Sequence, residues 1–380
     1  MLNQNKIAVI SSGNGGQTMA AYFANMGYTV SLYVREKERV VMFPHDKVFQ
    51  LRGLVEGNPV VSLISHNMSR VIKDAHLIMV TTPAQYHPVV AREMAKCLEK
   101  GQIIVLNPGR SFGTYVFKKT LAENGCKSDV IIAETETFVF ACRCARVAEP
   151  YIHGFKKRLD VAAHRPEDTP KVVEALSRVF PDVVEPAQNT LFTSFSNIGM
   201  IFHPLPILLN ITKVERKEKF YFYTEGISPL VANIIERLDR ERVNLASAYG
   251  IRVTSAFEWV LDHYGSEGDT LYERIQNNPA YANITAPIDI DTRYVYEDIA
   301  TGCVPMYFAG QAIGMDTPVI NSAILWASTI YATDFKQNGR NNEVIDFEEL
   351  KADAKRLMSP EATHPAPPES PSHESPEPTH

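Results

Sequence analysis

The chain has 380 residues and a formal net charge of -6, with 45% hydrophobic and 22% charged side chains. This balance is typical of a globular protein with two domains, and the lack of a basic excess argues against a nucleic-acid-binding protein. No apolar run approaches the roughly 20 residues of a membrane-spanning helix, and the five scattered cysteines match neither a disulfide framework nor a zinc site. We therefore expect no membrane segment, no metal, and the reducing cytoplasm as the compartment.

Short apolar runs alternate with amphipathic stretches in the first half of the chain, which is the pattern of strands joined by crossover helices. The first strand is expected at residues 6–10, followed by a glycine turn and a helix through about Met26. Further strands are predicted at residues 29–34, 76–81, 102–106, 130–133 and 159–163. This order predicts an α/β fold with a parallel, Rossmann-type sheet covered by helices on both faces.

Helical periodicity replaces the strand pattern from about Gln188 onward. One helix is predicted at residues 230–249 with Gly250 as its cap, and another at residues 318–331. The second has proline in its first turn, and its cap is expected to be either Asp316 or Thr317.

These patterns divide the chain into three parts. We predict a sheet domain over residues 1–187 and an all-helical domain over residues 188–358. Residues 359–380 are rich in Pro, Ser and Glu and contain no aliphatic side chain larger than alanine, which predicts a disordered tail.

A glycine-rich turn joins the first predicted strand to the first helix, with the sequence Ser11-Ser12-Gly13-Asn14-Gly15-Gly16. In dinucleotide-binding proteins such a turn brings backbone N–H groups and a helix N-terminus against a pyrophosphate. Gly13 and Gly16 take the second and third positions of the G-x-G-x-x-G pattern, whereas Ser11 stands in the first. A turn that only closes a strand–helix corner is the alternative, but the position between strand and helix favours a cofactor site at residues 12–16.

The residue after the second predicted strand bears on the choice between the two nicotinamide cofactors. Arginine there accommodates the 2′-phosphate of NADP(H), whereas an acidic residue bonds the ribose 2′-hydroxyl of NAD(H). Arg35 takes this position, although Glu36 and Glu38 follow closely and could equally bond the ribose 2′-hydroxyl. The sequence therefore favours NADP(H), with NAD(H) as the alternative.

The next strand ends are expected at the same edge of the sheet. Thr82 and Pro83 follow one strand, and residues 107–110 follow the next. We expect both loops beside the nicotinamide, although ordinary loops have a similar composition.

His203 is the candidate catalytic residue of the second half, in an apolar helical run that ends at Pro204. A lone histidine in such a place is more often a core residue. The segment 291–298 is the second candidate, because it gathers several carboxylates and Arg293 among apolar residues. Structural ion pairs are the alternative there, and the sequence alone does not show that His203 and Asp298 meet.

Several short motifs together resemble the octopine/nopaline (opine) dehydrogenase family, from about residue 6 to residue 335. In chain order they are Gly13-Asn14-Gly15-Gly16, Leu106-Asn107-Pro108-Gly109-Arg110, Ala133-Glu134-Thr135-Glu136-Thr137, Asn197…His203-Pro204, Arg293-Tyr294…Glu297-Asp298-Ile299 and Gly314…Thr317-Pro318. Their order and spacing carry the resemblance, because no one motif is decisive. The chain departs from the family pattern at Ser11, at the basic turn around Arg35 and in the Pro-rich tail.

The resemblance implies an enzyme that couples an amino acid to an α-keto acid, commonly pyruvate, and reduces the imine with NAD(P)H. It also implies a dinucleotide-binding domain followed by an all-helical domain. His203 matches the catalytic histidine of the family, Asp298 the acid paired with it, and Arg293 an arginine that holds substrate. The other matched substrate contacts are Asn197, Glu136 and Cys142. For Cys142, packing as a small hydrophobic residue is the alternative.

The chemistry gives each of these residue types a reason. An amine must be uncharged to attack a ketone, and imidazole, with a reference pKa of roughly 6.5, is the natural base near neutral pH. A carboxylate on the other ring nitrogen fixes the tautomer, and the planar fork of arginine binds substrate carboxylates.

Two other functions fit parts of the same pattern. A hydroxy-acid or polyol-phosphate dehydrogenase would share the two-domain architecture and use a lysine as proton donor, yet Lys213, Lys217 and Lys219 lie in a charged run typical of solvated surface. A non-catalytic NADP(H) sensor is the second alternative. The long apolar helices of the second half would also support a homodimer.

Overall fold

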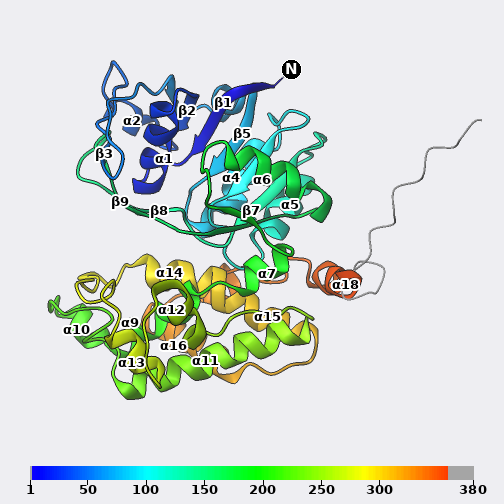
Figure 1. Cartoon of the computed structure of the whole chain (residues 1–380). Coiled ribbons are helices and arrows are strands. Elements are labelled where there is room, and N and C mark those ends of the chain that lie inside the picture. Colours follow the sequence, from blue (N-terminus) through cyan, green and yellow to red (C-terminus); the bar gives the residue numbers. More distant parts are fainter. Residues whose placement is uncertain (1, 358–380) are drawn as a thin grey trace, which may run out of the picture.

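The computed structural model describes residues 2–357; residue 1 and residues 358–380, which include the predicted Pro-rich tail, lie outside the described part. Figure 1 shows a sheet-containing half built from the first part of the chain and a helical half built from the second. The last strand ends at Pro186 and the next helix begins at Thr190, so the chain crosses between the halves once in this interval.

A single large sheet forms the first half, in the order β11-β10-β7-β6-β5-β1-β2-β4. Its strands are β1 (Asn3–Ile10), β2 (Thr29–Tyr33), β4 (Leu63–Ser65), β5 (Ala75–Val80), β6 (Ile103–Leu106), β7 (Ile131–Thr135), β10 (Leu159–Ala163) and β11 (Val184–Pro186). All the strands expected from the sequence are present, and their neighbours pair in parallel except that β10 runs antiparallel to β7. The expectation of a purely parallel sheet was wrong at this point, because no crossover helix links the two strands.

The connection between β7 and β10 consists instead of two antiparallel strands, β8 (Phe140–Cys144) and β9 (Pro150–Phe155). With β3 (Arg52–Gly53), which comes from an earlier part of the chain, they form a small second sheet of order β3-β9-β8. This sheet packs against α1 (Asn14–Asn25), the helix that follows the glycine-rich turn, and therefore borders the predicted cofactor site.

Helices cover both faces of the large sheet, as the sequence predicts. They are α1, α2 (Lys37–Val40), α3 (Met68–Ile72), α4 (His87–Met94), α5 (Gly113–Glu123) and α6 (Thr169–Ser177), with short 3₁₀ turns η1 (Ala84–Tyr86) and η2 (Pro166–Asp168). Alternate residues of β1 face opposite sides, since Ile7 and Val9 join one apolar core and Ala8 and Ile10 the other. The fully buried strand residues explain the continuous apolar runs in the sequence.

Helices are the regular elements of the second half in its described part, and loops connect them. Its elements are α7 (Thr190–Phe195), α8 (Gly199–Phe202), α9 (Pro204–Leu209), α10 (Ile211–Glu215), α11 (Pro229–Ala248), α12 (Ala256–Tyr264), α13 (Leu271–Gln276), α14 (Arg293–Asp298), the π-helical η3 (Ile299–Cys303), α15 (Val304–Ala312), α16 (Pro318–Ile330), α17 (Phe335–Asn338) and α18 (Phe347–Leu357). Phe112, Tyr115 and Val116, around the start of α5, belong to the core of this half. Side chains of the sheet half therefore pack inside the core of the helical half.

Both long helices predicted from the sequence are present as α11 and α16. Gly250 lies just beyond α11 with φ of 73°, a left-handed conformation that favours glycine after a helix. Thr317 is the N-cap residue of α16, but its side chain makes no capping hydrogen bond. Asp316 is not the cap.

The apolar run that contains His203 is longer than the sequence analysis stated. Thr190–Leu209 has a mean hydropathy of 1.3 over a length that would suffice for a membrane span, and 78% of its most apolar window is buried inside the protein. In the structure this stretch is divided into α7, α8 and α9, and its buried apolar residues belong to the helical core.

Candidate active site

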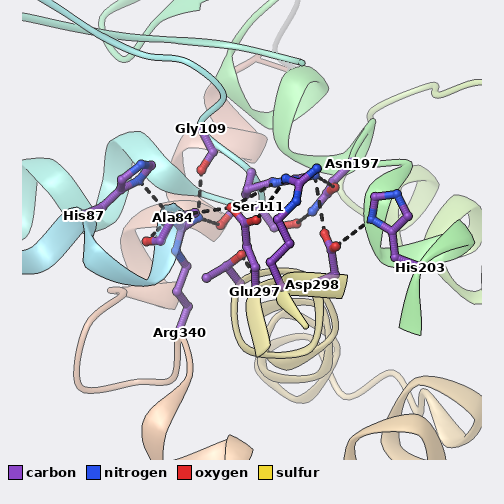
Figure 2. Close-up of polar contacts among 12 residues, drawn as sticks. Ala84, His87, Gly109, Ser111, Asn197, His203, Glu297, Asp298 and Arg340 are labelled. Atoms are coloured by element: carbon purple, nitrogen blue, oxygen red, sulfur yellow. Dashed lines mark hydrogen bonds and ion pairs between the residues drawn. The ribbon is translucent and has the colours of Figure 1, made fainter. Parts of the chain in front are cut away.

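His203 and Asp298 meet, although they lie 95 positions apart in the sequence. The imidazole Nδ1 is 2.7 Å from Asp298 Oδ2, and the Asp298 carboxylate is almost completely buried while His203 is 17% exposed. Among residues 2–357, none is hydrogen-bonded to the other ring nitrogen, Nε2. Figure 2 shows the two side chains facing each other from different helices.

The position of His203 follows from the local chain. It is the corner residue between α8 and α9, where Pro204 ends one helix and begins the next. The ring of Tyr294 stacks on the imidazole with a centroid distance of 4.1 Å and an interplanar angle of 7°. Packing on one face and the Asp298 hydrogen bond together fix the ring orientation.

Asp298 also contacts a third charged residue, Arg110, which the sequence analysis placed in a strand-end loop without a role. Arg110 Nη1 is 3.4 Å from Asp298 Oδ1, and its Nε is 3.5 Å from Glu297 Oε1. Burial by itself would raise the pKa of Asp298, but Arg110 and His203 together hold it below its ordinary value. The dyad therefore contains an ionised carboxylate.

Asn197, predicted as a substrate contact, is engaged at both ends of its amide. Its Oδ1 accepts from Arg110 Nη1 at 3.4 Å, and its Nδ2 donates to Ser111 Oγ at 3.1 Å. The residue is 3% exposed. These contacts favour a role in joining the halves of the molecule over direct substrate contact.

Arg340 was missed by the sequence analysis because it lies in a loop between α17 and α18 with no recognisable motif. The buried guanidinium donates to the carbonyls of Ala84, Gly109 and Ser111 and to His87 Nδ1 (Figure 2). It therefore fixes the loops after β5 and β6 against each other. The loop after β5 is also held by Glu297, whose Oε1 accepts from Ala84 N at 3.1 Å.

The glycine-rich turn has the geometry of a phosphate-binding turn. Gly13 is the N-cap of α1 without a side-chain capping bond, and the first turn of α1 contains no acidic residue. A Cβ on Gly16 would lie 1.9 Å from the carbonyl oxygen of Ser11, so only glycine permits this close strand–helix approach. The Asn14 side chain is already engaged, because its Oδ1 accepts from Cys144 N at 3.2 Å. The backbone N–H groups at the N-terminus of α1 are therefore the groups of this turn that suit an anion.

Buried polar atoms without partners lie at the adjoining strand ends. Thr81 Oγ1, Thr82 Oγ1 and both polar atoms of the Asn107 side chain have no hydrogen-bond partner among the described residues. Buried polar groups ordinarily have partners, so these orphans indicate a polar ligand at the carboxyl edge of the sheet. Together with the glycine-rich turn they fit a dinucleotide cofactor.

Arg35 lies beyond the end of β2 with half of its side chain exposed. Its guanidinium is 5.0 Å from the centroid of the Tyr86 ring and pairs with Glu36 at 2.8 Å. Both sequence candidates for the ribose, basic and acidic, are therefore side by side.

The remaining predicted substrate contacts have different surroundings. Arg293 is 62% exposed, lies beside the Tyr294 ring and approaches Glu297 at 3.6 Å. Burial and the neighbouring Asp160 carboxyl raise the pKa of Glu136 to about 7. Cys142 is partly buried and packs against the apolar core of the sheet. This packing agrees with the alternative in which Cys142 acts as a small hydrophobic residue.

The lysines considered for the rival dehydrogenase are outside this constellation. Lys217 and Lys219 are exposed after α10, and the Lys213 ammonium lies over the Phe220 ring at 5.1 Å. None of the three makes a contact with the dyad that the structure records.

Two family models match the two halves. Residues 6–136 match the NAD-dependent glycerol-3-phosphate dehydrogenase N-terminus, and residues 186–331 match the α-helical domain of NAD/NADP octopine/nopaline dehydrogenase. An opine dehydrogenase from Arthrobacter sp. (strain 1C) is 34% identical, covering 93% of this chain and 98% of the relative. D-nopaline dehydrogenase from Agrobacterium tumefaciens (strain T37) is 24% identical over 78% of each chain.

Solved structures show the same fold at low sequence identity. Octopine dehydrogenase with NADH and L-arginine superposes with a TM-score of 0.77 at 20% identity, covering 90% of this chain and 94% of the other. Yersinopine dehydrogenase with NADP⁺ bound gives a TM-score of 0.68 at 13% identity, covering 93% and 99%. These matches confirm a Rossmann-type domain followed by a helical domain.

Proposed function

The chain belongs to the opine dehydrogenase family, and from this premise we propose how its own residues perform the NAD(P)H-dependent condensation of an amino acid with an α-keto acid. It is an oxidoreductase acting on a CH–NH bond. The observation that carries the proposal is the His203–Asp298 pair, with Nδ1 2.7 Å from the carboxylate and Nε2 left for substrate.

His203 acts twice on the substrates. Nε2 removes a proton from the ammonium group of the amino acid, so that the free amine attacks the ketone carbon and forms the C–N bond. A proton passes from the nitrogen of this adduct to the former carbonyl oxygen, which gives the carbinolamine. The resulting imidazolium, stabilised by Asp298, returns its proton to the carbinolamine hydroxyl, which leaves as water and gives the protonated imine. NAD(P)H, when bound, supplies the hydride that reduces the imine carbon.

The other residues bind and orient. Arg293 is largely exposed beside the Tyr294–His203 stack, where a substrate carboxylate can reach its fork in addition to Glu297. Glu136 and Cys142 are proposed to border the amino acid, Cys142 mainly through packing. The turn at residues 12–16 and the loop of Thr82 and Pro83 would hold the cofactor.

We favour NADP(H) over NAD(H) as the cofactor. Arg35 is the basic residue at the end of β2, where a 2′-phosphate would lie, and its position over Tyr86 keeps the guanidinium at that edge. Glu36 partly neutralises the Arg35 charge through its ion pair. We therefore expect the enzyme to use NADH as well, but less efficiently than NADPH.

The reducing cytoplasm is the proposed compartment. All five cysteines are unpaired, which suits an environment that keeps thiols reduced.

A turnover assay tests the function. The purified protein is mixed with NADPH or NADH, a panel of amino acids, and pyruvate or another keto acid, and the loss of reduced cofactor is followed at 340 nm. Oxidation should require both an amine and a keto acid. His203→Gln should lower kcat by roughly 10²–10⁴-fold, the usual contribution of a general acid–base group, with little change in cofactor affinity.

The control variant is His153→Gln, which changes an exposed histidine of β9. Oxidation that needs only a keto acid would contradict the amine-coupling reaction. Full turnover in His203→Gln would remove His203 from the mechanism.

A further inference from the structure

Arg110 is the residue through which the sheet half reaches the catalytic pair. It lies in the loop between β6 and α5, whereas its partners Asn197, Glu297 and Asp298 all belong to the helical half. Its side chain is only 12% exposed. Figure 2 shows these partners, Asn197, Glu297 and Asp298, close together beside His203.

The backbone at Gly199 packs closely against the Arg110 guanidinium. A Cβ on Gly199 would lie 2.4 Å from Arg110 Nη1 and 2.8 Å from Asp298 Oδ1. Glycine at the start of α8 therefore allows the arginine and the carboxylate to approach each other. The contact is a built feature of the fold and not a surface ion pair.

We infer that Arg110 is a positioning residue that shares the Asp298 carboxylate with His203 and thereby sets the pH at which the catalytic pair takes up a proton. The inference rests on the proposed role of His203 as acid and base. Asp298 divides its oxygens, with Oδ2 2.7 Å from His203 and Oδ1 3.4 Å from Arg110.

The charge balance gives the direction of the effect. Without Arg110 the buried carboxylate would attract a proton to the pair more strongly, whether that proton resided on the imidazole or on the carboxyl. The pair as a whole would then lose its proton only at higher pH. With Arg110 in place, the negative charge is partly neutralised and the pair loses its proton at lower pH.

Other titratable and charged groups face the same pair. They are Arg293, Tyr294 and Glu297 of α14, Cys303 of η3, and Tyr223 in the loop before α11. Arg293 is largely exposed to solvent, which screens its charge, whereas Arg110 is enclosed. Arg110 is therefore the principal buried cation acting on Asp298.

The test is the pH profile of kcat/KM for four proteins: wild type, Arg110→Met, Arg110→Gln and Arg110→Lys. Removal of the charge in the Met and Gln variants should move the acid limb upward by about one pH unit, the lower end of the effect of a charge at 4–6 Å. Activity below the limb would fall about tenfold more than activity on the plateau. Arg110→Lys should keep the limb within a few tenths of a unit of wild type.

Arg242→Lys is the matched control, because Arg242 is a second buried arginine paired with a carboxylate, Asp239, at 2.6 Å. It should leave the acid limb in place. A limb that stays fixed in Arg110→Met and Arg110→Gln, with an equal loss at every pH, would overturn the inference and leave Arg110 a structural residue.

A measurement without turnover separates this inference from the proposed function. The ring nitrogens of ¹⁵N-histidine-labelled protein are titrated by NMR, with His203 assigned by its absence in His203→Gln. A shifted His203 titration in Arg110→Gln supports the inference even if the substrate is wrong. An active His203→Gln contradicts the proposed mechanism, whereas an inactive His203→Gln with an unshifted Arg110 variant contradicts only the role of Arg110.

Discussion

Ser11 stands where the glycine-turn pattern has its first glycine, and its backbone shows why glycine is usual there. Its φ of 155° lies at the edge of the region that L side chains rarely adopt. The turn keeps its geometry because Ser11 Oγ accepts from Gly13 N at 3.2 Å, which stabilises the serine in this conformation. Serine therefore replaces glycine at the first position of the pattern without changing the fold of the turn.

Arg35 should determine the preference between NADPH and NADH. Arg35→Asp should lower kcat/KM for NADPH by roughly 10–100-fold, the value of one charge-assisted hydrogen bond, and lower it much less for NADH. The measurement is the ratio of the two kcat/KM values at one ionic strength. Arg237→Asp, at an exposed arginine of α11, serves as the control. An unchanged ratio in Arg35→Asp would mean that another group contacts the ribose phosphate.

At the scale of elements, the helix that carries Asp298 does not end regularly. It continues into the π-helical turn η3, and π-helical turns are often found at functional sites. A Cβ on Gly302 of this turn would lie 2.6 Å from Met200 Cβ, so η3 packs closely against α8. This packing holds the helix of Asp298 against the helix that ends at His203.

The start of α16 shows a cap that comes from another element. Glu241 of α11 accepts from Val319 N at 2.8 Å and from Ile320 N at 2.9 Å, whereas the Thr317 hydroxyl, at the N-cap, has no partner among the described residues. Glu241→Ala should therefore lower the free energy of unfolding by about 1–2 kcal/mol. Thr317→Val should change it by less than about 0.5 kcal/mol.

Urea unfolding of the two variants and wild type measures the difference. The helix prediction at residues 318–331 was right because its apolar spacing is local. Its capping residue was not predictable, because Glu241 lies far away in the sequence. A larger loss in Thr317→Val than in Glu241→Ala would contradict this capping arrangement.

At the scale of the whole molecule, a buried glutamate joins the two halves. Glu134 of β7 accepts from Thr193 Oγ1 at 2.6 Å and from Ser194 Oγ at 3.0 Å, both on α7. Burial raises the pKa of Glu134 to about 7, although these hydrogen bonds oppose the shift. The carboxyl therefore titrates in the physiological range at the junction of the halves.

The pH dependence of stability follows from this pKa. Between about pH 4.5, where an unfolded glutamate titrates, and about pH 7, the folded chain binds a proton that the unfolded chain does not. Glu134 therefore lowers stability as pH rises through this window, by on the order of 1 kcal/mol per pH unit. Burial lowers the pKa of His87, which acts in the opposite direction, so only the difference between variant and wild type is informative.

Glu134→Gln should abolish this contribution. The difference in unfolding free energy between the variant and wild type, measured in urea at pH 5, 6, 7 and 8, should become more favourable to the variant up to about pH 7 and then level off. The exposed Glu185→Gln in β11 is the control and should run parallel to wild type. A Glu134→Gln curve parallel to wild type would show that the carboxyl does not titrate in this window.

The sequence by itself determined the elements whose signals are local. Apolar runs, the glycine-rich turn and helical periodicity placed six strands of the large sheet, α1, α11 and α16 close to their observed bounds, because side-chain periodicity reports the face that is buried. The short strands β4 and β11 at the two edges of the sheet were not predicted. The candidate residues His203 and Asp298 came from motifs, and a resemblance supplied their pairing.

Only the tertiary structure decided which side chains meet. The antiparallel β10, the capping by Glu241 and the buried arginines Arg110 and Arg340 depend on contacts between segments far apart in the chain. No local pattern encodes such contacts, since a loop arginine looks the same whether it lies in solvent or between two buried carboxylates. The fold brings Arg110 to Asp298, and that proximity gives the arginine its effect on the catalytic pair.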